Sequence, residues 1–265
     1  MAYDVGPGMS TSPATRVAPE HERTGQGAGR IGLIDVARGV AIVAVVVYHL
    51  VWDLGDLGLI DSTPAQGETG KNVAHGIAGS FIFLVGVSLV LAHGDRFRPR
   101  KFLRRLAELV GYALLVSVVT LLIFPSQWVS FGILQCLAVA SVLALPFLRA
   151  SRLLAVGAAV LAFALPGLVT IPGDSRWLSW TGLTEGVQPT IDHAPLLPLF
   201  GLTLLGIVLM RTLRERGDDV RLARVRTDRG PLGWLAFVGR HTLVIYLLHQ
   251  PILLGLLNAW VWLRR

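Results

Sequence analysis

Seven long apolar stretches follow one another along the chain. They cover about residues 31–54, 73–93, 104–124, 128–148, 152–172, 194–213 and 241–262. About 20 apolar residues in a helix cross the roughly 30 Å hydrocarbon core of a bilayer, and lipid offers no hydrogen-bond partner to open backbone. The pattern predicts an all-α, polytopic integral membrane helix bundle with about seven transmembrane helices. Only Pro125, Ser126 and Gln127 separate the third stretch from the fourth, which predicts a tight hairpin.

The composition supports a membrane protein. Hydrophobic residues make up 53% of the chain and charged residues only 15%, whereas a soluble domain carries about 25% charged residues. The formal net charge of +7 comes almost entirely from arginine. In a chain of this kind such a surplus usually encodes orientation, so we expect the lipid bilayer as a partner and no nucleic acid.

The distribution of basic residues predicts the orientation. Arginine and lysine gather in the N-terminal tail and after the second, fourth and sixth stretches, while the other side has only Lys71, Arg176, Arg264 and Arg265. The positive-inside rule therefore places the N-terminus in the cytoplasm. Residues 1–29 have no apolar periodicity, so we expect a disordered cytoplasmic tail, followed by one membrane domain over residues 30–265.

The first apolar stretch contains four titratable residues, Asp35, Arg38, His49 and Asp53. At about 100° per residue all four lie on one face of a helix. Ionisable groups inside a membrane span are costly and are functional candidates by default. The structural alternative is that Asp35 and Arg38 form an i, i+3 pair at the water interface and that His49 hydrogen-bonds a neighbouring helix.

The outer end of this face has the residue types of a general base. Asp53 lies one helical turn beyond His49, where a carboxylate can orient an imidazole. His75 begins the second stretch and His193 the sixth, so both approach the same side of the membrane, as catalytic residues or as interfacial caps. A metal site built from the three histidines has no close ligand spacing to support it, and we expect no metal.

Further polar residues lie inside later stretches. Gln135 interrupts the fourth, while His249 and Gln250 precede Pro251 in the seventh. His249 and Gln250 can satisfy the backbone break that proline causes, or they can line a polar tunnel. Gln135 and Gln250 are candidate donors to an oxyanion. Arg240 enters the seventh stretch from the cytoplasmic side, where a guanidinium can bind phosphate or simply obey the orientation rule.

Five segments, in order, resemble a known family. They are RIGLIDVARGVAIVAVVVYHLVWDL from Arg30, GSFIFLVGVSL from Gly79, FGILQCLAVASVL from Phe131, DHAPLLPLFGLTLLG from Asp192 and GRHTLVIYLLHQPILL from Gly239. Together they are similar to the bacterial branch of the heparan-alpha-glucosaminide N-acetyltransferase catalytic-domain family, over about residues 30–255. The first and last also resemble the broader membrane acyltransferase superfamily, in which an Arg precedes a His by eleven residues, as Arg38 precedes His49.

The resemblance implies transfer of an acetyl or other acyl group from cytosolic acyl-CoA, the donor substrate, to an extracytoplasmic acceptor, a sugar or glycan. It places the chain in the bacterial cytoplasmic membrane, and it leaves open whether the protein is a homo-oligomer. His49 would be the catalytic base or acyl carrier. Arg38 would contact the donor or help assemble the site, and Asp35 would hold Arg38.

From these observations we expect a catalytic set of His49, Arg38, Asp53 and His75. The expected donor-binding set is listed by residue as Asp35, Arg38, Arg240, Gln135, His249 and Gln250. One alternative is a transporter or flippase that uses the same polar face as a substrate path, although no internal repeat supports it. Another is a structural membrane protein whose buried polar groups only join helices.

Overall fold

The computed structural model describes residues 31–61 and 63–264, so the predicted disordered tail lies outside the described part. Within that part the chain is all-α. The helices are α1 (Gly32–Asp56), α2 (Thr63–Gln66), α3 (Glu68–His93), α4 (Pro99–Ile123), α5 (Ile133–Leu143), α6 (Arg152–Leu168), α7 (Leu196–Glu215), α8 (Asp218–Ala223), α9 (Gly230–Arg240) and α10 (Thr242–Leu263), with short 3-10 turns at Leu145–Leu148 and Ser179–Thr181.

Each of the seven predicted stretches contains a helix. Among the described residues, α1, α3, α4, α7 and α10 are long and apolar enough to cross a membrane by length and composition, whereas α5 and α6 are shorter apolar helices. The all-α membrane-protein prediction is therefore confirmed. The count of seven crossings and the cytoplasmic N-terminus stay predictions.

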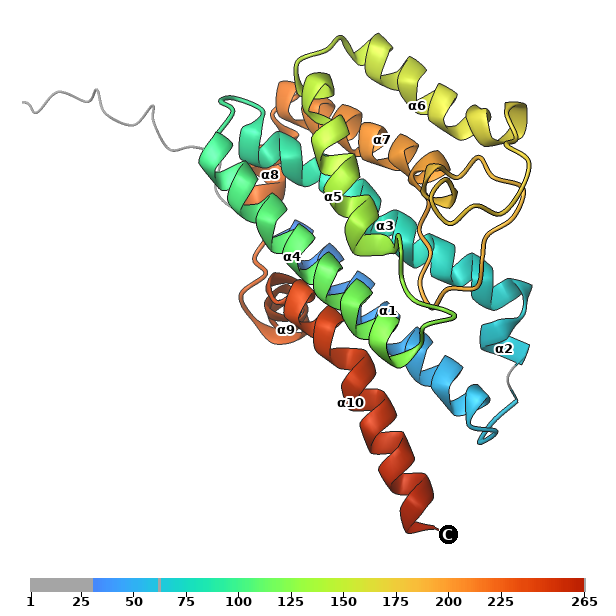
Figure 1. Ribbon diagram of the computed structural model, residues 1–265. Helices are drawn as coiled ribbons and strands as arrows, with labels where there is room; N and C mark the ends of the chain where they lie inside the picture. Colours follow the sequence, from blue (N-terminus) through green and yellow to red (C-terminus); the bar gives the residue numbers. More distant parts are fainter. Residues whose placement is uncertain (1–30, 62, 265) are drawn as a thin grey trace, which may run out of the picture.

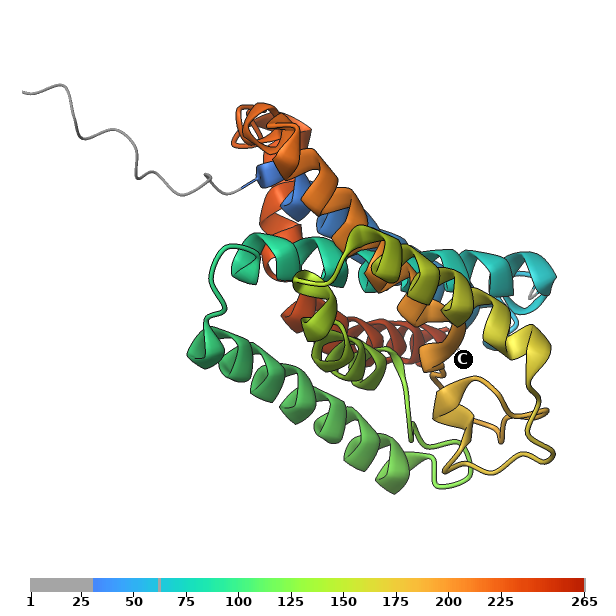
Figure 2. The same cartoon turned by 90° about the horizontal axis from the view of Figure 1, so that it is seen from above.

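The helices form an elongated bundle (Figures 1 and 2). α1 packs against α3, α9 and α10, α3 packs along α7, and α6 lies on the outer side of α7. The largest fully buried side chains include Ile42 on α1, Ile82 on α3 and Leu204 on α7. The distal half of α10 projects from the bundle in Figure 1, and His249 is the one buried residue of this helix.

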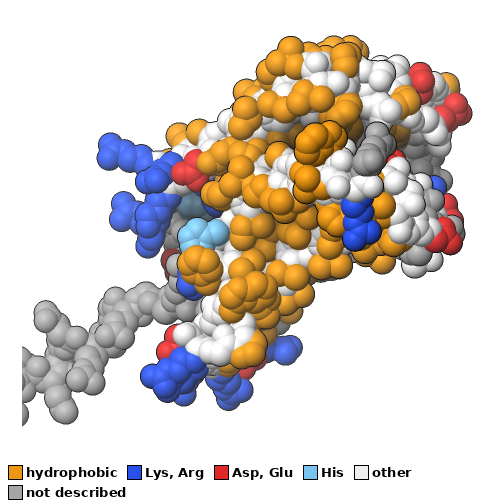
Figure 3. All heavy atoms as spheres, turned by 90° about the horizontal axis from the view of Figure 1, so that it is seen from below, with side chains coloured by type: hydrophobic (Ala, Val, Ile, Leu, Met, Phe, Trp, Pro, Cys, Tyr) orange, Lys and Arg blue, Asp and Glu red, His pale blue; other side chains and the backbone are white. Residues whose placement is uncertain are grey.

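The surface of the described residues is that of a membrane protein. Large apolar side chains are strongly exposed on the outer helices, for example Leu122 on α4 and Leu153 on α6. Hydrophobic side chains cover the middle of the face in Figure 3, and most of its basic side chains gather toward the end from which the tail leaves. Apolar exposure on this scale requires lipid rather than water around the bundle.

Two local expectations are wrong. The predicted tight hairpin between the third and fourth stretches is a longer loop over residues 124–132, because this segment folds against the loop before α7. There, Ile191 N donates to Gln127 O (2.9 Å) and Arg176 donates to Trp128 O (3.1 Å). The second difference is α9, an additional short helix, so that Arg240 and His241 lie at a break between two helices rather than at the start of a continuous span.

α9 lies directly against the first half of α1. A Cβ atom at Gly39 would meet the backbone of Leu235, and a Cβ atom at Gly239 would meet the backbone of Asp35. Only glycine permits this backbone-to-backbone approach, as in small-residue helix crossings of membrane proteins. The crossing fixes the position of Arg240 at the end of α9 relative to Asp35 on α1.

Candidate functional site

The four titratable residues of α1 face the protein interior along its whole length. Asp35 and Asp53 are buried, and Arg38 and His49 are partly exposed. At about 1.5 Å rise per residue, Asp35 and Asp53 lie about 27 Å apart along the axis. This face, which we call the polar edge, is polar at its two ends and apolar between them, where the buried Ile42 and Val45 belong to a hydrophobic cluster. α9 and α3 lie beside its first half and α10 beside its second half.

The far end of this edge holds a compact polar group, which we call the histidine cluster: His49, Asp53, His249 and Gln250. The ring centres of His49 and His249 are 4.9 Å apart. Gln250 Nε2 donates to both carboxylate oxygens of Asp53, at 2.9 and 3.2 Å. Residues almost 200 positions apart thus meet in the bundle interior, where hydrogen bonds are little weakened by water.

The hydrogen bonds of α10 define which atoms of the cluster are still available. His249 Nδ1 lies 2.6 Å from Tyr246 O, and a carbonyl oxygen can only accept, so Nδ1 carries the proton. Gln250 uses its amino group on Asp53. His249 Nε2 and Gln250 Oε1 are buried and have no hydrogen-bond partner among the described residues.

Asp192, in the loop before α7, ties α10 to the start of α5. Its Oδ2 atom accepts a hydrogen bond from Ile133 N (2.9 Å) and one from Tyr246 OH (3.2 Å). Burial raises the pKa of Asp192, and the two hydrogen bonds oppose that rise. Asp192 is thus a cap for α5 and an anchor for the helix that carries His249.

His75 and His193 lie close enough to interact electrostatically. His75 is exposed on α3 and His193 is partly buried. Burial lowers the pKa of His193, and the charge of His75 lowers it further. Among the described residues no hydrogen bond or ring contact joins either of them to His49, so the structure adds no contact to the prediction that His75 is catalytic.

Gln135 is engaged in local structure at the start of α5. Its Oε1 accepts from Gly132 N (3.1 Å), and its Nε2 donates to Ser117 Oγ (2.9 Å) and toward Ala113 O (3.4 Å) on α4. These contacts join α4 to α5. They occupy the amide hydrogens that an oxyanion would need.

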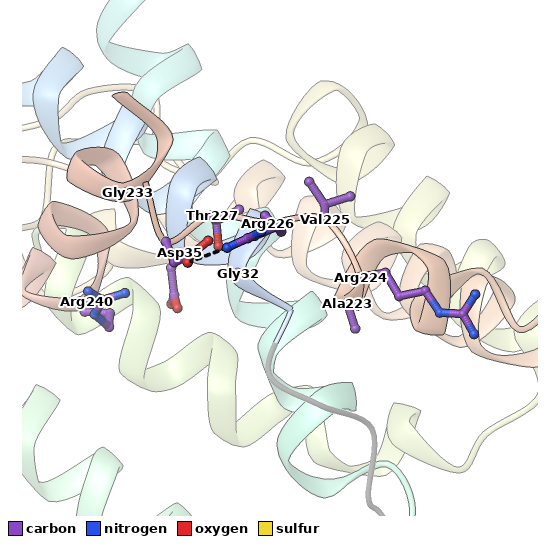
Figure 4. Close-up of a pocket in the computed structure, with 10 residues that line it drawn as sticks. Gly32, Asp35, Ala223, Arg224, Val225, Arg226, Thr227, Gly233 and Arg240 are labelled. Atoms are coloured by element: carbon purple, nitrogen blue, oxygen red, sulfur yellow. Dashed lines mark hydrogen bonds and ion pairs between the residues drawn. The ribbon is translucent and has the colours of Figure 1, made fainter. Parts of the chain in front are cut away.

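The near end of the polar edge opens into a cavity of about 440 Å³, which we call the arginine pocket (Figure 4). Its lining comes from α1, from the segment after α8 and from α9, and includes Asp35, Arg224, Arg226, Thr227 and Arg240. In Figure 4, Arg224 and Arg240 lie at opposite ends of this lining, with Asp35 and Thr227 between them. All three arginines are exposed, so the pocket is open, basic and suited to a phosphate-bearing ligand.

Arg38 continues the polar edge from the pocket toward the interior. Its guanidinium donates to Asp35 Oδ1 (3.2 Å) and to Ser88 Oγ on α3 (2.5 Å). The expected i, i+3 contact of Asp35 with Arg38 is therefore formed. Asp35 belongs to both features, because it lines the pocket and holds Arg38.

A family model described as heparan-alpha-glucosaminide N-acetyltransferase, catalytic, matches residues 30–251. The chain belongs to this family. No curated protein and no solved structure matches the chain.

Family membership makes this protein an enzyme and a membrane acetyltransferase, since the family consists of acetyl-CoA-dependent transferases. The matched residues begin just before α1 and end at Pro251 in α10. They therefore include the whole histidine cluster and the whole arginine pocket.

The structure brings together some of the predicted residues and adds others. His49, Asp53, His249 and Gln250 form one cluster, although the last two were predicted to bind the donor. Tyr246 and Ser88 were not predicted, because nothing in one sequence shows which partner a buried hydroxyl has. Arg224 and Arg226 were not predicted as individual site residues, because their shared cavity depends on the approach of α9 to α1.

Proposed function

We propose that this membrane acetyltransferase moves an acetyl or other acyl group from cytosolic acyl-CoA to an extracytoplasmic acceptor of the sugar or glycan type. The arginine pocket binds the phosphates of the donor, and the histidine cluster is the site of transfer. The observation that carries the proposal is their arrangement at the two ends of one polar edge on α1.

The separation of the two features matches the shape of the donor. Asp35 in the pocket and His49 in the cluster are about 21 Å apart along α1 at about 1.5 Å per residue. An extended CoA molecule carries its phosphates at one end and its thioester at the other end of a long pantetheine arm. With the phosphates between Arg224 and Arg240, the arm extends along α1 past Arg38 toward His49.

The cluster has the groups that acyl transfer needs. An acceptor N–H or O–H group attacks the thioester carbonyl carbon, a new N–C or O–C bond forms, and the C–S bond breaks. His49 takes the proton that the acceptor loses and returns it to the departing CoA thiolate, which becomes the free thiol. Asp53, one turn away and held by Gln250, favours the protonated imidazole during the reaction.

The remaining predicted residues take supporting roles in this proposal. Arg38 contacts the donor arm and Asp35 fixes its guanidinium. His75, beside His193, faces the side from which the acceptor approaches.

Calorimetry with the full chain in lipid nanodiscs tests the proposal. We expect saturable binding of acetyl-CoA, weakened about tenfold by Arg240→Ala, because a charge-assisted hydrogen bond is lost. Dephospho-CoA, which lacks the 3′-phosphate, should bind wild type less tightly than CoA. Arg105→Ala, an exposed arginine on α4 outside the pocket, is the matched control and should bind like wild type.

The same preparations are then assayed for release of the CoA thiol in the presence of sugar acceptors. Absence of acyl-CoA binding by folded wild-type protein, or equal weakening by Arg105→Ala and Arg240→Ala, would contradict the proposed donor site. Binding followed by acceptor-dependent thiol release supports both halves of the proposal.

A further inference from the structure

His249 and Gln250 present two unmatched atoms next to the proposed reaction site. Among the described residues, His249 Nε2 and Gln250 Oε1 are the buried side-chain nitrogen and oxygen atoms without a hydrogen-bond partner. They belong to neighbouring residues of α10, and the His249 ring lies against that of His49. A buried polar atom without a hydrogen-bond partner destabilises the fold by about 1–3 kcal/mol. These two atoms therefore indicate a ligand that supplies hydrogen-bond donors.

The hydrogen bonds around the two atoms determine their character. His249 Nδ1 donates to Tyr246 O, so Nε2 of the neutral ring has a lone pair and no hydrogen. Gln250 Nε2 donates to Asp53, so the free atom of that amide is its carbonyl oxygen. Both free atoms are therefore hydrogen-bond acceptors.

Two acceptors cannot stabilise the oxyanion of a tetrahedral intermediate, which needs donors. They also have nothing to bind on a thioester, which carries no N–H or O–H at its reacting carbon. The remaining reactant is the acyl acceptor, whose nucleophilic group carries one or more such hydrogens.

We propose that His249 Nε2 and Gln250 Oε1 bind the reactive N–H or O–H group of the acyl acceptor and hold it beside His49. The inference rests on the proposed function and names the atoms that receive the acceptor. It assigns His249 and Gln250 to binding of the acceptor, whereas the sequence placed them in the expected donor-binding set. Asp53 acts through Gln250 as a positioning residue, because its carboxylate turns the amide so that Oε1 points away from it.

The first arm of the test needs no acetyl-CoA. The full chain in nanodiscs is prepared with ¹⁵N-labelled histidine rings, and the Nε2 resonance of His249 is assigned by its loss in His249→Gln. D-glucosamine and D-glucose are titrated separately. A saturable shift of this resonance with either sugar is expected; a shift with glucosamine alone identifies the amine as the bound group, and a shift with both shows that a hydroxyl is sufficient.

The second arm measures acceptor-dependent thiol release. His249→Phe keeps a ring of similar size and removes the lone pair, so the KM for the sugar should rise about tenfold or more, while the Kd for acetyl-CoA stays at the wild-type value. His249→Gln, whose amide oxygen can reach the former Nε2 position, should recover part of the loss. Thermal unfolding of both variants shows whether they fold.

Three results overturn the inference. The first is a His249 resonance that neither sugar moves, as expected if only a water molecule occupies the site. The second is an unchanged KM for the sugar in folded His249→Phe. The third is a loss of acetyl-CoA affinity in His249→Phe as large as the rise in the KM for the sugar. Failure of the proposed function is distinguishable, because absent donor binding in wild type leaves the sugar titration readable.

Discussion

The histidine cluster and the arginine pocket lie at opposite ends of α1 in contrasting surroundings. In the cluster, Asp53 and His249 are buried, and the polar groups that contact one another come from α1 and α10, two helices far apart in the sequence. In the pocket, the three arginines are exposed and the cavity is open. A buried cluster depends on every partner, whereas exposed charges contribute individually and weakly.

This difference suits the two halves of the proposed reaction. Bond chemistry needs fixed groups in a water-poor environment, and a cytosolic donor needs a site that it can reach from water. Substitutions in the cluster should therefore have large effects on turnover and folding, and substitutions in the pocket should have smaller effects that salt modulates.

The largest effect is expected from His49→Ala. If His49 is the general base, its loss should lower kcat about 10²–10⁴-fold while acetyl-CoA binding stays unchanged. Single-turnover kinetics and calorimetry on the same preparation measure the two quantities. Val47→Ala, which removes a strongly exposed apolar side chain two residues away, should leave both unchanged; a drop in kcat of the same size in that variant would mean that any perturbation of α1 stops turnover.

The second effect concerns stability. Gln250→Leu leaves the buried Asp53 carboxylate without the amide that donates to it at 2.9 and 3.2 Å, so the free energy of unfolding should fall by about 1–3 kcal/mol. Asn258→Leu is the matched control, because Asn258 is exposed on the same helix and its amide donates only to Leu254 O. Denaturant titration in mild detergent compares the two. Equal losses in the free energy of unfolding would show that the hydrogen bonds from Gln250 to Asp53 stabilise the fold no more than the exposed amide of Asn258 does.

These contacts also show which features of the structure can be predicted from one sequence. The seven apolar stretches predict helices well because lipid forces the backbone into helices, and the 3.6-residue period places Asp35, Arg38, His49 and Asp53 on one face. The approach of His249 and Gln250 to that face could not be predicted, because it depends on how α10 packs.

Two other features escaped prediction for related reasons. The Asp192 contact with Ile133 and Tyr246 depends on a loop folding back over another helix, and loop geometry leaves no periodic signal. α9 had a usable signal in Gly230 and Pro231 followed by apolar residues, the pattern of a helix start, but the segment is too short to be recognised as a span.

The third prediction compares the effect of salt on donor binding at one end of α1 with its effect on the chemical step at the other end. Raising the salt concentration from about 0.05 to about 0.5 M should weaken acetyl-CoA binding several-fold in wild type, because exposed arginine–phosphate contacts are screened. Arg224→Ala should bind less tightly at low salt and depend less on salt. The rate of the chemical step at saturating donor should hardly change with salt, since Asp53 and His249 of the histidine cluster are buried. A chemical step as salt-sensitive as binding would place exposed charges at the reaction site.

The smallest effect is expected at His193, in the loop before α7. Burial lowers its pKa, and the charge of His75 lowers it further. A histidine whose folded pKa lies below its unfolded value is neutral in the fold, so stability falls as pH drops through the ordinary histidine pKa of about 6.5 toward the folded value. His75→Gln removes the second cause and should raise the pKa of His193 part of the way back. NMR titration of labelled histidine rings measures this directly, with His93→Gln, at the other end of α3, as the control. An unchanged His193 pKa in His75→Gln would show that the charge of His75 does not act on His193. It would also remove the electrostatic reason for placing His75 beside the acceptor.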